Sequence, residues 1–151
     1  MKTFIAATIL LAACAATAAF AAEKKVKMED LPPAVQQAIK DNTKDVTLVG
    51  ISKDVENGKT EYEAETKANG HGKDITFDES GKLIAVEEEV ALDSLPAPAK
   101  AAIEKQAAGG KIRKVEKVTE GDKTFYEAGI LKGGKKSEAL VLPDGTPTKE
   151  D

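Results

Sequence analysis

The chain has few of the side chains that usually carry chemistry. Its 151 residues include no tryptophan, one histidine and one cysteine, and aromatic residues make up 4% of the sequence. The histidine lies in Asn69-Gly70-His71-Gly72, a pattern typical of a solvated turn. General acid–base catalysis needs a partner beside the titrating group, and the sequence has neither a nucleophile–base–orienter set nor a glycine-rich phosphate loop. We therefore expect no enzyme activity, no catalytic residues, no cofactor and no metal site.

The N-terminal residues 1–21 have the pattern of a secretory signal peptide. Met1-Lys2 provides a positive start, an apolar run follows from Thr3 to Ala13, and Ala19-Phe20-Ala21 places small residues two apart. The apolar run is shorter than the roughly 20 residues that a membrane-spanning helix needs. We therefore expect cleavage after Ala21 and a periplasmic or secreted protein.

A second processing route is open at the only cysteine. Leu11-Ala12-Ala13-Cys14 resembles the lipobox of bacterial lipoproteins, in which the cysteine is lipidated and becomes the mature N-terminus. Apolar residues continue beyond Cys14 as far as Ala22, which favours simple cleavage. Membrane attachment is expected only if Cys14 is lipidated. If Cys14 leaves with the signal peptide, the mature chain has no thiol for a disulfide or a metal.

Acidic residues outnumber basic ones. The chain has 26 Asp and Glu against 22 Lys and Arg, and the expected signal peptide removes only Lys2 from this balance. Nucleic-acid binding usually shows as a basic stripe, and membrane attachment by charge needs a polybasic patch. We therefore expect no nucleic acid as a partner, but another envelope or secreted protein; the sequence leaves the oligomeric state open.

The chain matches itself at an offset of 64 residues without a gap. The matching pairs are Leu31-Pro32 with Leu95-Pro96, Ala38-Ile39 with Ala102-Ile103, Lys59-Thr60 with Lys123-Thr124, Tyr62-Glu63-Ala64 with Tyr126-Glu127-Ala128, and Gly70 and Gly81 with Gly134 and Gly145. Internal self-similarity of this kind determines the architecture of a chain. We therefore divide the chain into a signal peptide (1–21), a first module (22–89) and a second module (90–151).

Each copy predicts one helix followed by strands. Leu31-Pro32-Pro33 is typical of a helix start, and Leu31, Val35, Ala38 and Ile39 form one apolar stripe at helical spacing. The predicted strands are 46–54, 60–67, 75–77 and 82–89 in the first copy, and 111–119, 123–132, 136–142 and 146–149 in the second. Tyr62 and Tyr126 lie on the inward side of their strands. The predicted fold class is α+β, with two tandem helix-plus-antiparallel-meander (αβ4-like) modules and the helices packed on one face of the sheet.

These motifs resemble those of the PepSY-like domains, and more closely the beta-lactamase-inhibitor-like group of that clan. Residues 31–39 read Leu-Pro-x-x-Val-x-x-Ala-Ile, residues 57–63 read Asn-Gly-Lys-Thr-Glu-Tyr-Glu, and residues 72–78 read Gly-Lys-Asp-Ile-Thr-Phe-Asp. The resemblance implies a periplasmic or extracellular binding module, in some relatives an inhibitor of a secreted hydrolase that grips its target with a concave sheet. This chain lacks the disulfides and exposed aromatic residues of such inhibitors, so we transfer no target-contacting residue to it.

The two copies differ on the outward side of their second strand. The first copy has Glu61, Glu63, Glu65 and Lys67 there, and the second has Phe125, Glu127, Gly129 and Leu131. Apolar side chains on an open sheet face often mark a contact surface. We therefore predict a binding face formed by Phe125, Leu131, Glu127, Glu61 and Glu63.

Together these features predict a non-enzymatic exported binding or inhibitory module of the bacterial cell envelope, with a secreted hydrolase or peptidase as one target class. Two alternatives stay open. Glu87-Glu88-Glu89 with the glutamates of the 60–67 strand predicts an acidic patch, and hence a cation-responsive sensor, although the spacing matches no EF-hand loop. The other alternative is a purely structural envelope protein.

Overall fold

A computed structural model describes residues 24–56 and 58–149. The expected signal peptide, its cleavage after Ala21 and the alternative lipidation at Cys14 lie outside these residues. The helices are α1 (Pro33–Asn42) and α2 (Ala97–Ala107), each preceded by a 3-10 turn, η1 (Met28–Asp30) and η2 (Leu92–Ser94). The strands are β1 (Lys24–Lys25), β2 (Thr47–Glu56), β3 (Lys59–Ala68), β4 (His71–Asp78), β5 (Leu83–Glu89), β6 (Lys111–Glu120), β7 (Lys123–Lys132) and β8 (Lys135–Val141). Within the described part of the chain, no helix is long and apolar enough to cross a membrane.

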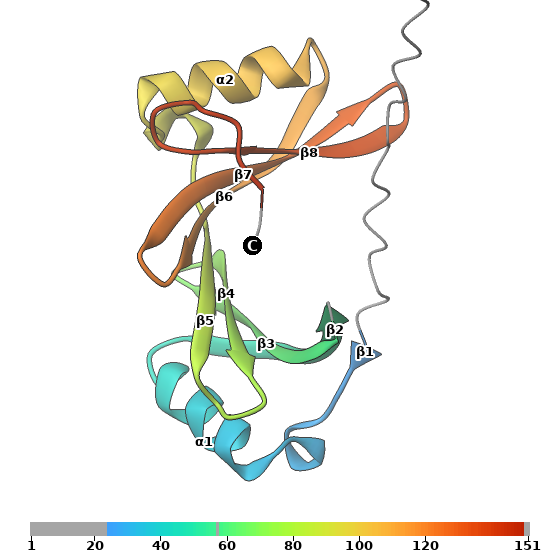
Figure 1. Ribbon diagram of the computed structural model, residues 1–151, viewed down its shortest axis with the longest axis vertical. Coiled ribbons are helices and arrows are strands. Elements are labelled where there is room, and N and C mark those ends of the chain that lie inside the picture. Colours follow the sequence, from blue (N-terminus) through green and yellow to red (C-terminus); the bar gives the residue numbers. More distant parts are fainter. Residues whose placement is uncertain (1–23, 57, 150–151) are drawn as a thin grey trace, which may run out of the picture.

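The strands form one continuous antiparallel sheet of eight strands in the order β1 to β8 (Figure 1). The predicted fold class, two tandem helix-plus-meander modules, is therefore wrong. The reason is the pairing of β5 with β6, from Ala85 opposite Glu120 to Glu89 opposite Glu116, which joins the two halves edge to edge. The strand predicted at 146–149 is reduced to a single bridge between Val141 and Pro147.

Helix α1 forms and packs as its apolar stripe predicts. Pro32 precedes the helix and Pro33 occupies its first position, where a missing N–H costs nothing. The Thr43 hydroxyl donates to the carbonyl of Ile39 at 2.8 Å and helps to end the helix. The buried residues of this first core are Leu31, Val35, Ile39, Ile51, Tyr62, Ala64, Ile75 and Phe77.

Helix α2 packs on the second half of the sheet, on the same face as α1. The buried residues of its main core are Leu95, Ala99, Ile103, Val115, Ala128 and Val141. Val86 contacts the first core and Val90 the second. These two residues are four apart along one extended segment, so they point to the same side of the sheet. Both helices therefore cover one face and leave the other face without helices.

The offset of 64 residues recurs in the local structure. The register shift between Leu48 and Gly50 in β2 returns between Ile112 and Lys114 in β6. A Cβ placed on Gly81 would lie 2.7 Å from the carbonyl oxygen of Ala34 in α1, and one on Gly145 would lie 2.6 Å from that of Pro98 in α2. Both glycines have positive φ, +81° and +85°. The repeat therefore specifies how each helix meets the sheet, although it does not divide the sheet in two.

The sheet curves strongly along its length. Figure 1 shows α1 and α2 at opposite ends of the molecule, on the outer side of this curve. The face without helices lines the inside of the curve. We call this inner surface the concave face.

Candidate binding face

A hollow of about 400 Å³ lies on the concave face where the two halves of the sheet meet. Its floor follows one row of neighbours across five strands. Ser52 lies opposite Glu63, Glu63 opposite Thr76, Thr76 opposite Ala85, and Ala85 opposite Glu120. The hollow therefore depends on the pairing of β5 with β6, which brings Glu120 to the first half of the sheet.

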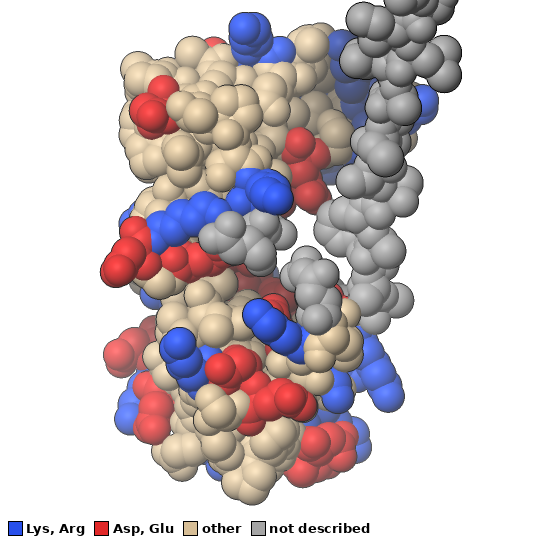
Figure 2. Space-filling view, in the orientation of Figure 1, with Lys and Arg blue, Asp and Glu red and all other residues tan. Residues whose placement is uncertain are grey.

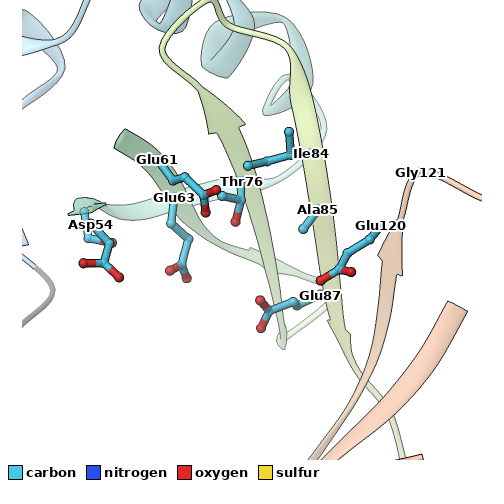
Figure 3. A pocket seen from close by; sticks show the side chains of 10 residues that line it. Asp54, Glu61, Glu63, Thr76, Ile84, Ala85, Glu87, Glu120 and Gly121 are labelled. Atoms are coloured by element: carbon cyan, nitrogen blue, oxygen red, sulfur yellow. The ribbon is translucent and has the colours of Figure 1, made fainter. Parts of the chain in front are cut away.

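Five carboxylates line this hollow. They are Asp54, Glu61, Glu63, Glu87 and Glu120. Figure 3 shows that they come from β2, β3, β5 and β6 and surround a common space, with Glu87 and Glu120 side by side on neighbouring strands. Acidic side chains are also visible across the narrow waist of the molecule in Figure 2. We call these five residues the acidic hollow; a concave site lined by one sign of charge concentrates the opposite charge.

One lysine, Lys114, lies close to two carboxylates next to the acidic hollow. The Lys114 ammonium lies 2.5 Å from Glu116 Oε1 and 4.0 Å from Asp74 Oδ2. Partial burial works to lower the pKa of Lys114, but its hydrogen bond to Glu116 and the charges of Glu116, Asp74 and Glu87 outweigh burial, so that the pKa is raised. Glu116 itself is 7% exposed. Lys114 therefore stays charged and compensates a nearly buried carboxylate.

Replacing Lys114 by glutamine is expected to lower the free energy of unfolding by about 1–3 kcal/mol near pH 7, because Glu116 loses its cation. Since the pKa of Lys114 is raised in the folded state, its contribution is fully present below the unfolded pKa and is lost as the pH rises through the folded pKa. The difference between wild type and variant should shrink only in strongly alkaline solution. Urea unfolding between pH 7 and pH 11 measures this, and a difference that is constant with pH would contradict the role of Lys114.

A second hollow, of about 330 Å³, lies on the far end of the concave face. It is lined by Arg113, Gly129, Ile130, Leu131, Lys136, Ser137 and Glu138. Gly129 takes the place that Glu65 has in the first half, and nothing lies within 4 Å of a Cβ placed on it. The missing side chain therefore leaves this hollow open.

The predicted binding residues are only partly brought together. Glu61 and Glu63 line the acidic hollow, and Leu131 lines the second hollow. Glu127 lies on the same face between them, opposite Glu116 and Leu140.

Phe125 differs from its prediction as an exposed apolar residue, because its side chain is 0% exposed. It lies opposite Val118, which is 2% exposed, and the Lys123 ammonium lies 5.1 Å from the centre of its ring. The same ammonium donates to the carbonyl of Lys149 at 2.9 Å and so ties the C-terminal segment to this part of the face. Phe125 is therefore a core residue on the concave side.

Two other predictions concern single residues. Tyr62 is buried in the first core and Tyr126 packs against the second, which confirms their inward orientation. His71 is exposed at the start of β4. Within residues 24–56 and 58–149, no group of three His, Cys, Asp or Glu side chains is placed to hold a metal ion.

Asp54 and Glu120 belong to the acidic hollow but are not among the residues predicted from the sequence. The sequence places Glu87 only in a general acidic patch. Asp54 could have been found, since Asn-Gly at positions 57–58 of the sequence is a hairpin signal, and pairing around it places Asp54 opposite Glu61. Glu120 had no such signal, because nothing in the sequence indicates that β5 and β6 are neighbours.

One family model matches two overlapping regions of the chain, residues 20–85 and 60–136. Its description is "Putative beta-lactamase-inhibitor-like, PepSY-like". The chain belongs to this family. No curated protein matches this PepSY-like chain.

Solved structures similar to this PepSY-like protein come from Bacteroides species. A protein from Bacteroides eggerthii, described as "putative periplasmic", is 20% identical with a TM-score of 0.64, over 79% of this chain and 86% of the other. A DUF2874 family protein from Bacteroides ovatus is 20% identical with a TM-score of 0.61, over 79% and 85%. A BLIP-like protein from Bacteroides fragilis is 21% identical with a TM-score of 0.56, over 78% and 83%. At these identities the similarity shows a shared fold.

Proposed function

We propose that this PepSY-like protein is a non-enzymatic, exported binding module of the bacterial envelope, and that its concave face binds a basic segment of another protein. The observation that carries the proposal is the acidic hollow, in which five carboxylates surround a space of about 400 Å³. Export is supported by the signal-peptide pattern of residues 1–21. It is further supported by the similar protein from Bacteroides eggerthii, which is described as periplasmic. Inhibition of a secreted hydrolase or peptidase is one form that such binding can take.

The sheet gives the acidic hollow a fixed geometry. Its carboxylates stand on paired strands, so a ligand does not have to order a loop before binding. At 4 Å, a pair of opposite charges near a protein surface is worth about 4 kcal/mol, against about 1 kcal/mol in bulk water. Lysine or arginine side chains that enter the hollow would gain from several carboxylates at once. Arginine would gain most, because its guanidinium can bind a carboxylate through two hydrogen bonds.

A short arginine peptide tests the proposal directly. We expect acetyl-Gly-Arg-Gly-Arg-Gly-amide to shift the backbone amide signals of Glu63, Ala85 and Glu120 in NMR spectra of the mature protein. The triple variant Glu61→Lys/Glu63→Lys/Glu87→Lys should weaken this binding at least about 100-fold, which corresponds to about 2.7 kcal/mol. The affinity should also fall steeply with salt, since the site is open to solvent.

A matched control separates the acidic hollow from the overall charge. Glu29→Lys/Glu79→Lys/Glu104→Lys changes the net charge by the same amount at exposed positions beside the helices. This control variant should bind the peptide with nearly the wild-type affinity at physiological salt. Equal losses in both triple variants, or peptide shifts confined to the helix side, would rule out the proposed site. The same pair of variants can then be used to identify the natural partner by cross-linking in periplasmic extract.

A further inference from the structure

Among residues 24–56 and 58–149, no strand pairs with the outer edge of β8 over most of its length. Its counterpart in the first half, β4, is covered by β5 from Leu83 to Glu88. In the described part of the chain, backbone pairing with the outer edge of β8 is limited to two contacts. They are the bridge between Val141 and Pro147 and the hydrogen bond from the Thr148 N–H to the carbonyl of Leu140. The stretch 135–139 therefore presents an unpaired strand edge, which is a template for adding another strand.

The turn before β8 determines which backbone groups face outward. Gly133 and Gly134 both have positive φ, +56° and +79°, as in the two-residue hairpin turns that close on a hydrogen-bonded pair. That pair is Lys132 and Lys135. Because hydrogen-bonded and non-hydrogen-bonded pairs alternate, the backbone groups of Ser137 and Ala139 face β7. Those of Lys136 and Glu138 face outward.

We propose that β8 pairs with β8 of a second copy of this chain, antiparallel and centred on Ser137. This register places the outward N–H and C=O groups of Lys136 opposite those of Glu138 in the second copy, and the reverse. The two side chains belong to the concave face, where both line the second hollow. Each lysine therefore meets a glutamate across the new strand pair, and opposite charges at such positions stabilise a sheet.

Other registers of the same pairing are disfavoured by charge and by space. A shift in one direction places Lys136 opposite Lys136, and like charges directly opposite destabilise a strand pair. A shift in the other direction places Glu138 opposite Glu138. That second shift also requires the outward groups of Leu140, whose carbonyl already accepts the Thr148 N–H at 3.0 Å. The register centred on Ser137 is the one in which the charges complement each other.

The same side chains explain why the edge would not recruit strands at random. Lysines on an edge strand are a common protection against unspecific pairing, and Lys135 and Lys136 are both exposed here. A strand without an acidic residue opposite Lys136 leaves that charge uncompensated. Because the contact is isologous, each copy uses its own β8 edge to bind the other, and assembly stops at the dimer.

Variants that reverse the charge of Lys136 or Glu138 test the proposed dimer. Sedimentation equilibrium of the mature protein over a wide concentration range should show a monomer–dimer equilibrium. Lys136→Glu and Glu138→Lys should each weaken self-association by at least about tenfold, since each single variant has like charges at both pairs. An equimolar mixture of the two variants should associate again, because both pairs are then opposite in charge. Lys135→Glu, which lies opposite Ala139 in this register, is the matched control and should associate like the wild type.

Backbone pairing is tested separately by Lys136→Pro. This substitution removes only the outward-facing N–H, so the ladder with β7 remains and far-UV circular dichroism should be unchanged. The variant should be monomeric. A wild type that stays monomeric at millimolar concentration would overturn the proposal, as would a mixture that fails to associate or species larger than a dimer. Binding of the arginine peptide does not involve this edge, so failure of the dimer and failure of the proposed function are distinguishable.

Discussion

Replacing Phe125 by alanine is expected to lower the free energy of unfolding by about 3–5 kcal/mol, the usual cost of deleting a buried phenylalanine ring. The ring is 0% exposed and lies opposite the buried Val118 on the concave side of the sheet. Its removal would leave a cavity under Lys123 and next to the C-terminal segment that Lys123 binds. Urea unfolding monitored by circular dichroism measures the loss.

Leu131→Ala is the matched control for Phe125→Ala. Leu131 is on the same strand and the same face, but it is only half-buried and lines an open hollow. Its truncation should cost about 1 kcal/mol, in the normal range for a partly exposed site. A loss below about 1 kcal/mol for Phe125→Ala would mean that the ring is exposed in solution. In that case Phe125 would again be a candidate contact residue, as its sequence position first indicated.

The sequence predicts the helices and most strands of this fold well, because proline and glycine residues mark where they begin and end. The strand expected at 123–132 coincides with β7 (Lys123–Lys132). Pro33 marks the start of α1, and Pro96 precedes α2. Proline and glycine act through their own backbone geometry, which does not depend on distant contacts. The offset of 64 residues is visible partly for the same reason, because Pro32, Gly70 and Gly81 recur at Pro96, Gly134 and Gly145.

The long-range arrangement could not be predicted in the same way. A period of two says which residues of a strand share a face, but not which strand lies beside it. The pairing of β5 with β6 joins the two expected modules into one continuous sheet, a point on which the sequence is silent, and brings Glu120 next to Ala85. Phe125 is likewise buried beside a long-range contact, because the Lys123 ammonium over its ring also donates to the carbonyl of Lys149. Both errors therefore concern contacts between segments that the repeat does not relate.

The continuous sheet is also what creates the candidate site. Glu61 and Glu63 stand in the first half, and Glu120 ends the first strand of the second half. In two separate sheets these carboxylates would lie on different surfaces. As one sheet, the strands hold them around a common hollow, opposite the face that the helices cover (Figures 1 and 3). One continuous sheet therefore places carboxylates of both halves on the same face, around the hollow where the halves meet.

Replacing Gly145 by alanine is expected to cost about 2–5 kcal/mol of folding stability. Alanine at φ +85° is strained by about 1–2 kcal/mol. The new Cβ would lie 2.6 Å from the Pro98 carbonyl oxygen, so the start of α2 must also move. Such overpacking costs about 1–3 kcal/mol in addition. Gly81→Ala should behave alike in the first half, because its Cβ would lie 2.7 Å from the Ala34 carbonyl oxygen. Thermal and urea unfolding measure both variants.

Gly134→Ala isolates the backbone strain from the helix contact. Gly134 has φ +79°, but nothing lies within 4 Å of a Cβ placed on it, so alanine there should cost only about 1–2 kcal/mol. The excess loss in Gly145→Ala then measures how tightly α2 is held against the sheet, and equal losses would contradict a tight contact. Because the displaced helix lies on the outer face, the folded fraction of Gly145→Ala should still bind the arginine peptide with wild-type affinity. A loss of peptide binding in this variant would show that the helix position controls the acidic hollow through the sheet.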